Sequence, residues 1–123
     1  MNNLKYSIIY GVIRSEIAER LSLGLIFVNG DKINIRYSQK KLNALQYLLS
    51  SHEYRFIVKV LRALSKNNNI SSAETINYLT RYSNNLIAVS QLQSVDLKPS
   101  SKNEDWLFRN YVYAGTKKTK NKL

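Results

Sequence analysis

The sequence predicts an α+β fold in which a small antiparallel sheet carries about four helices, packed mainly on one of its faces. Strand-like segments come first, stretches with helical periodicity follow, and one more strand precedes a last helix. The chain has 123 residues, of which 44% are hydrophobic, and this suffices for one domain with a sizeable core. We therefore expect a single domain over residues 1–114 and a basic tail over residues 115–123.

Three segments near the N-terminus are predicted to be strands. Lys5–Val12 is rich in β-branched and aromatic residues, which favour strands. Leu21–Phe27 and Lys32–Ser38 alternate in polarity on either side of Asn29-Gly30, a pair typical of hairpin turns. Together these segments indicate the antiparallel sheet.

The loop of this hairpin determines which residues share a face. A two-residue turn at Asn29-Gly30 would oppose Leu25 to Asn34 and mix apolar with polar side chains on both faces. A three-residue loop over Val28–Gly30 would oppose Leu25 to Ile33 and leave one apolar face. The pattern favours this longer loop, whose outer face holds Lys32, Asn34, Arg36, Ser22, Gly24, Ile26 and Ser38. Such a face is commonly solvated, and the same residues could also meet a partner.

Four helices and one further strand are predicted beyond the hairpin. The helices are Gln39–Ser50 with Ser38 as N-cap, Glu53–Lys66, a segment from Ser71 to Ser83 that opens with a capping-box pattern, and Glu104–Ala114. The strand is Leu86–Leu92. The helical side chains expected to face the core are Leu42, Leu45, Leu48, Leu49, Ile57, Val60, Leu61, Leu64, Trp106, Leu107, Tyr111 and Val112.

Charge is the most pronounced feature of the composition. The net charge is +11, which favours an anionic partner such as nucleic acid, an acidic protein surface or anionic lipid. In the second predicted helix four cations recur along one side, opposite the apolar stripe. A solvated outer face explains that pattern, and so does phosphate contact, with Tyr37, Tyr47 and Tyr54 available for base stacking. The candidate residues for an anionic partner are Lys32, Arg36, Arg55, Lys59, Arg62, Lys66, Lys117 and Lys118.

The sequence offers little for catalysis. It has no cysteine, which excludes disulfides, thiolate metal sites and a cysteine nucleophile, and we expect no metal and no cofactor. It also lacks a glycine-rich phosphate loop and a nucleophile elbow. Glu19 and the single histidine, His52, are the groups on which an acid–base reading would rest. No run of apolar residues reaches the length of a membrane helix, and we expect a cytoplasmic protein.

Several short motifs occur in order along nearly the whole chain: Lys5–Tyr10, Glu19 with Leu23–Phe27, Ser90–Val95 and Trp106–Val112. Together they resemble the bacterial domain-of-unknown-function family 3037. Its members tend to show a "Y-S-I" strand, an "R-G-E-x-x-N-x-G" stretch and a late "L-F-x-x-Y-V" helix. Glu19 and Gly24 match the second motif, whereas Ile17 stands in the place of its Arg and Ser22 in the place of its Asn. If those polar positions form a site in the family, this chain lacks part of it.

The resemblance implies a partner rather than a reaction. Genes of the family are often found beside those of kinase-like proteins that resemble the HipA toxin. The expected function is therefore a non-catalytic protein-interaction or regulatory module of a bacterial toxin–antitoxin or defence locus, with a HipA-like kinase as the candidate partner. The alternative is a nucleic-acid-binding protein that contacts phosphates through a basic surface. The sequence does not indicate an oligomeric state.

Overall fold

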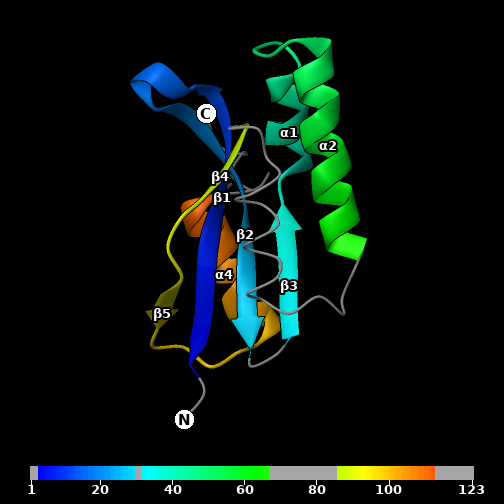
Figure 1. Cartoon of the computed structure of the whole chain (residues 1–123). Helices are drawn as coiled ribbons and strands as arrows, with labels where there is room; N and C mark the ends of the chain where they lie inside the picture. The colour runs from blue at the N-terminus through cyan, green and yellow to red at the C-terminus, as the bar shows by residue number, and fades with distance from the viewer. Residues whose placement is uncertain (1–2, 30–31, 67–85, 113–123) are drawn as a thin grey trace, which may run out of the picture.

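A computed structural model describes residues 3–29, 32–66 and 86–112, and it has an α+β architecture (Figure 1). A five-stranded antiparallel sheet has the order β3-β2-β1-β4, and β5 pairs with the other part of β1. The strands are β1 (Leu4–Arg14), β2 (Glu19–Asn29), β3 (Lys32–Tyr37), β4 (Ile87–Val89) and β5 (Gln93–Val95). The helices are α1 (Gln39–Leu45), α2 (Ser51–Lys66) and α4 (Ser101–Tyr111), and the short turn η1 (Ser15–Ile17) joins β1 to β2.

The predicted α+β class with its small antiparallel sheet is confirmed, but the helix layers differ from the prediction. The described residues hold three α-helices rather than about four, and the predicted helix from Ser71 to Ser83 lies outside them. Figure 1 shows α1 and α2 together on one side of the sheet, with α4 passing behind the strands. The prediction that helices pack mainly on one face is therefore incomplete, because α4 covers the other face.

Two buried clusters lie on the two faces of the sheet. Leu23, Ile26 and Val28 pack with α1 and α2, whereas Leu25 and Phe27 pack with α4. Every residue of β2 from position 23 to position 28 is buried. A continuous apolar run of this kind is typical of a strand that is covered on both faces, and the middle of β2 is such a strand.

The predicted hairpin register is wrong. Leu25 pairs with Arg36 and Val28 with Ile33, so Val28 and Asn29 belong to β2 rather than to the loop. Leu25 therefore shares a face with Arg36. This mixes apolar and charged residues, which is the reason the prediction rejected the two-residue turn at Asn29-Gly30. The prediction assumed one solvated face, but α4 covers this face and offers carboxylates to Asn34 and Arg36.

A glycine in the middle of a strand often marks a close approach of two backbones, and the structure confirms this expectation for Gly24. A Cβ atom added to this residue would overlap the carbonyl oxygen of Arg36 and would lie 2.9 Å from the Cα of Tyr37. Gly24 pairs directly with Tyr37, at the last rung between β2 and β3. The absence of a side chain at Gly24 therefore lets β3 come this close to β2.

Local capping groups shift several predicted boundaries. Ser38 caps α1 as expected, since its Oγ accepts a hydrogen bond from the Lys41 amide. The helix ends at Leu45, short of the predicted Ser50, because Ser50 and Glu53 form a capping box that starts α2. Ser100 likewise caps α4, which begins at Ser101 rather than at Glu104. The predicted strand over residues 86–92 is shorter, and β5 follows it as an additional strand.

The core residues of α2 are all buried as predicted, but those of α1 and α4 are only partly correct. Leu107 and Val112 are buried, whereas Trp106 is 50% exposed and Tyr111 is 45% exposed. A helix turns about 100° per residue, so with Leu107 facing the sheet its neighbour Trp106 points to the side. Tyr111 stacks on Tyr6 with 5.4 Å between the ring centroids. Leu48, predicted to face inward from α1, is 54% exposed in the turn beyond that helix.

The remaining large-scale predictions concern the ends of the chain and the membrane. Residues 115–123, predicted to form a basic tail, lie outside the described residues. Among the helices of the described part, none has the length and apolar character needed to cross a membrane.

Candidate docking surface on helix α2

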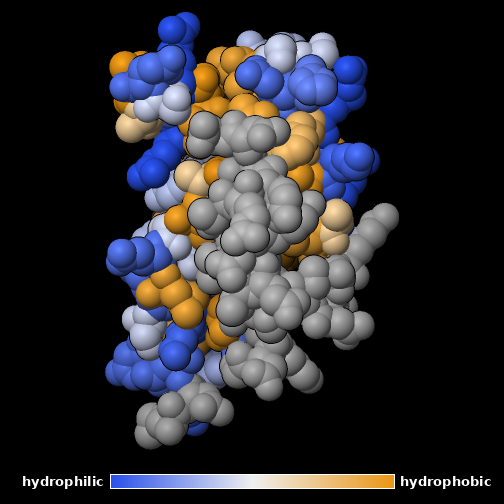
Figure 2. All heavy atoms as spheres, viewed as in Figure 1, coloured by the Kyte–Doolittle hydropathy of each residue, from blue (hydrophilic) through white to orange (hydrophobic). Residues whose placement is uncertain are grey.

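The inward packing of α2 determines where its cations point. Ile57, Val60, Leu61 and Leu64 lie in the cluster against the sheet, so the opposite side of the helix faces outward. Arg55, Lys59 and Arg62 are all exposed on that outer side, as their spacing predicts. In Figure 2 hydrophilic side chains gather along the outer edge of the helix layer, at the upper right. Because the apolar side of α2 packs on the sheet, these three cations lie exposed on the surface.

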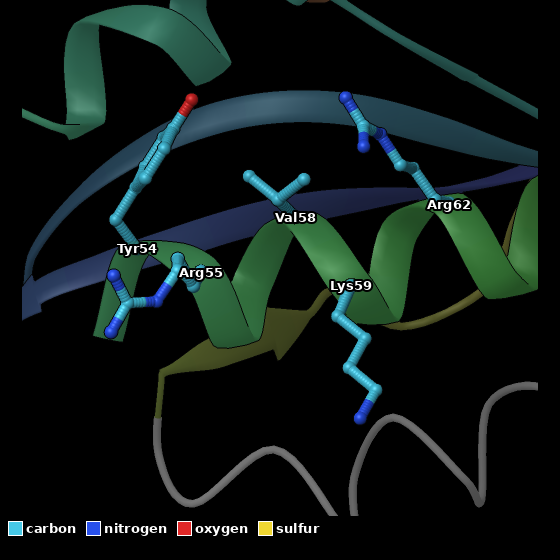
Figure 3. Close-up of a pocket in the computed structure, with 5 residues that line it drawn as sticks. All are labelled: Tyr54, Arg55, Val58, Lys59 and Arg62. Atoms are coloured by element: carbon cyan, nitrogen blue, oxygen red, sulfur yellow. The ribbon is translucent and has the colours of Figure 1, made fainter. Parts of the chain in front are cut away.

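A shallow groove of about 530 Å³ runs along this helix. Its described lining comes entirely from α2: Tyr54, Arg55, Val58, Lys59 and Arg62. Figure 3 shows Tyr54, Val58 and Arg62 projecting on one side of the helix and Arg55 and Lys59 on the other. Tyr54 and Val58 are half-buried, so part of each is available at the surface. The groove thus combines an apolar strip with a row of positive charge.

The cations of this groove have no acidic partner in the described part of the chain. The ion pairs found there join Arg14 to Glu19, Arg36 to Glu104 and Asp105, and Arg109 to Asp105. Glu53, the acidic residue of α2, has its carboxylate engaged with the Ser50 amide at 3.1 Å. Arg55, Lys59 and Arg62 therefore form a concentration of positive charge that the described residues leave uncompensated.

Arg36, also predicted to face an anionic partner, is turned toward its own chain. Its guanidinium lies 3.4 Å from the Glu104 carboxylate and 3.5 Å from that of Asp105, and it donates to the Ser101 carbonyl oxygen at 3.3 Å. Asn34 donates to the same Glu104 carboxylate at 2.7 Å. These acidic residues lie in the first turns of α4, where negative charge also stabilises the helix dipole. The structure therefore gives Arg36 a role in holding α4 to the sheet.

The other predicted cations cannot be placed in the same way. The side chains of Lys32 and Lys66 lie outside the described part of the structure, as do Lys117 and Lys118. Of the residues that line the groove, Val58 was not singled out from the sequence. The available signal in the sequence was an apolar residue four positions after Tyr54 and next to Lys59.

Glu19 and His52, the residues of the acid–base reading, are not joined by any hydrogen bond or ion pair in the described part of the chain. Glu19 starts β2 and lies 3.8 Å from the Arg14 guanidinium, and His52 is exposed in the first turn of α2. A smaller polar hollow of about 350 Å³ lies nearby, and Glu16 and Glu53 contribute to its lining. Within the described ranges no three histidine or acidic side chains gather as a metal site would require.

The positions of the polar family motif lie on the β1–β2 hairpin. Ile17 is 68% exposed at its tip, and Ala18 turns the chain with φ 55, in the left-handed region that favours glycine. The Ser22 hydroxyl accepts a hydrogen bond from the Lys41 ammonium at 2.9 Å. Burial lowers the pKa of that Lys41 ammonium. Ser22 and Gly24 therefore serve packing between β2 and its neighbours.

Comparison with known proteins identifies no relative: no protein-family model matches the chain, and no curated protein or solved structure is detectably similar to it. The resemblance to family 3037 therefore stays a prediction from the motifs.

Proposed function

We propose that the protein is a non-catalytic docking module that binds an acidic surface of a partner protein through the exposed basic side of α2. The observation that carries the proposal is the set of three exposed cations that the described residues leave unpaired. Like charges at these helical spacings repel one another weakly, and an acidic partner relieves that repulsion. The partner that the sequence resemblance suggests is a HipA-like kinase of the same toxin–antitoxin or defence locus, regulated by the docked module.

Nucleic acid is the second candidate partner. The net charge of +11 favours it, and phosphate groups would meet the same three cations on α2. In that case the affinity for duplex DNA should fall steeply with salt, with each phosphate contact contributing about 0.9 to the slope of log K against log salt. A protein partner also uses the apolar strip of the groove, which phosphate contacts do not need.

The test is affinity capture from the native host with a tagged protein, with and without nuclease treatment, followed by mass spectrometry. The informative variant reverses three charges of the groove: Arg55→Glu, Lys59→Glu and Arg62→Glu. The matched control reverses three exposed lysines elsewhere: Lys5→Glu, Lys98→Glu and Lys102→Glu. Both variants change the net charge equally, so a difference between them reports the position of the charge rather than its amount.

The proposal predicts one protein that resists nuclease and is lost with the groove variant but retained with the control. Equal capture of that protein by both variants would exclude α2 as the docking face. Capture that disappears on nuclease treatment would overturn the protein partner in favour of nucleic acid. Both variants must show the same thermal midpoint as the original chain, since exposed charges contribute little to stability.

A further inference from the structure

The groove on α2 presents its apolar and basic residues in separate rows. Tyr54 and Val58 are four residues apart and project on one side of the helix, while Arg55 and Lys59 have the same spacing on the other (Figure 3). Arg62 continues the first row beyond Val58. An apolar strip of about 6 Å, the rise over four residues of a helix, is therefore bordered by positive charge along one side and at one end.

The exposed apolar strip indicates a ligand that carries apolar groups as well as negative charge. Tyr54 and Val58 pack partly against the main core, and the remainder of each side chain is part of the groove wall. A simple phosphate or a run of carboxylates would leave that apolar surface in water. The groove volume of about 530 Å³ is instead in the range of sites that take several groups of a ligand at once.

We infer that the groove receives an amphipathic acidic segment of the partner protein, with an apolar side chain on Tyr54 and Val58 and carboxylates facing Arg55, Lys59 and Arg62. Charge complementarity selects an acidic segment, and the apolar strip selects one that carries a hydrophobic anchor. The inference rests on the proposed function and narrows it, because it states what the partner must present. The apolar anchor supplies affinity, whereas the carboxylates set the orientation and the approach.

The experiment measures binding of four fluorescent probes by anisotropy. The first is a peptide of about 12 residues with leucines on one helical face and glutamates on the others, long enough to cover the groove at ~1.5 Å per residue. The second has the same composition with the leucines scattered around the helix. The third is a poly-glutamate peptide of equal length, and the fourth is a single-stranded oligonucleotide of similar charge.

The full chain should bind the amphipathic peptide about tenfold more tightly than either the scattered peptide or poly-glutamate. Val58→Thr, which keeps the shape of the side chain but replaces one methyl group by a hydroxyl, should weaken that binding about fivefold without changing its salt dependence. Val58→Ile should retain the affinity, which controls for a loss of packing in α2. Arg55→Gln with Lys59→Gln should weaken all acidic probes and flatten the salt dependence.

The possible failures separate the two proposals. Equal binding of the three peptides, with no effect of Val58→Thr but a clear loss in the Arg55→Gln, Lys59→Gln variant, would overturn the apolar anchor and leave the basic docking face standing. If the Arg55→Gln, Lys59→Gln variant binds the peptides with unchanged affinity, the docking face itself would be overturned. Tightest binding of the oligonucleotide, abolished by the same variant, would overturn a protein segment as the occupant.

Discussion

Arg36 and Arg62 both belong to residues 32–66, where eight basic residues stand against one acidic residue, but their surroundings in the fold are opposite. Arg36 on β3 lies against the first turns of α4, where Glu104 and Asp105 compensate its charge. Arg62 on α2 is exposed, and the described residues provide it with no carboxylate. The difference teaches that net charge identifies a chain that favours anions, but only the packing of helices on the two sheet faces separates structural cations from available ones.

The largest expected effect comes from detaching α4 from the sheet. Leu107 is fully buried in the cluster of Leu25 and Phe27, so Leu107→Ala should lower the free energy of unfolding by about 2–5 kcal/mol. Leu48→Ala is the matched control, because Leu48 is 54% exposed and should change stability by less than about 0.5 kcal/mol. Urea denaturation measures both. Similar losses in the two variants would mean that α4 does not anchor this face.

A smaller loss is expected when β3 is pushed away from β2. Gly24→Ala should cost about 1–3 kcal/mol, because the new methyl group would meet the backbone of Arg36, which cannot move alone. Gly11→Ala should cost less, because its methyl group would meet the ends of the Leu45 and Leu23 side chains, which can rotate. Thermal and urea unfolding compare the two variants. A greater loss at Gly11 would contradict the close approach of β2 and β3.

The two arginines can then be compared directly. Arg36→Met removes a half-buried ion pair and should lower stability by about 1–2 kcal/mol, with part of this loss recovered when Glu104→Gln is added. Arg62→Met should change stability by less than about 0.5 kcal/mol, because the side chain is exposed. A double-mutant cycle in urea gives the coupling between Arg36 and Glu104. Zero coupling would remove the structural role assigned to this pair.

The smallest effect on stability at ordinary pH is expected from Tyr6, which stacks on Tyr111 at the C-terminal end of α4. Burial, followed by the neighbouring Tyr111, raises the pKa of the Tyr6 phenol from 10.0 to about 12. The folded state holds this proton more tightly, so stability is unaffected below pH 10 and decreases as the pH rises from about 10 to about 12. Urea unfolding across this range should show the decrease, and Tyr6→Phe should reduce it. An unchanged decrease in Tyr6→Phe would assign it to other groups.

The sequence predicted those features that depend on local pattern. The α2 apolar stripe, the Ser38 cap and the close approach at Gly24 all follow from spacing or from backbone geometry near one residue. The hairpin register did not follow, because the choice depended on whether the polar face of β3 meets water or another helix. Glu104 lies 70 positions after Asn34, and no local pattern near the hairpin reveals that contact.

The candidate site was predicted in part for the same reason. Spacing alone placed Arg55, Lys59 and Arg62 on the outer side of α2, and the structure has them there. Arg36 was grouped with them because its charge is equal, although its surroundings are different. Val58 was missed because an apolar residue beside the main stripe becomes part of a surface only when the packing angle of the helix is known.

The measurement that tests the account most directly is the affinity of two variants for the amphipathic acidic peptide, determined beside their urea stability. Arg55→Gln, Lys59→Gln, Arg62→Gln should bind at least tenfold more weakly, a change of about 1.4 kcal/mol, with stability unchanged. Arg36→Met should bind the peptide with the affinity of the original chain, measured under conditions where both proteins are folded. Its midpoint of urea unfolding should be lower than that of the original chain. The account would be contradicted if Arg36→Met lost the affinity and the α2 variant kept it, because the available cations would then be those of β3.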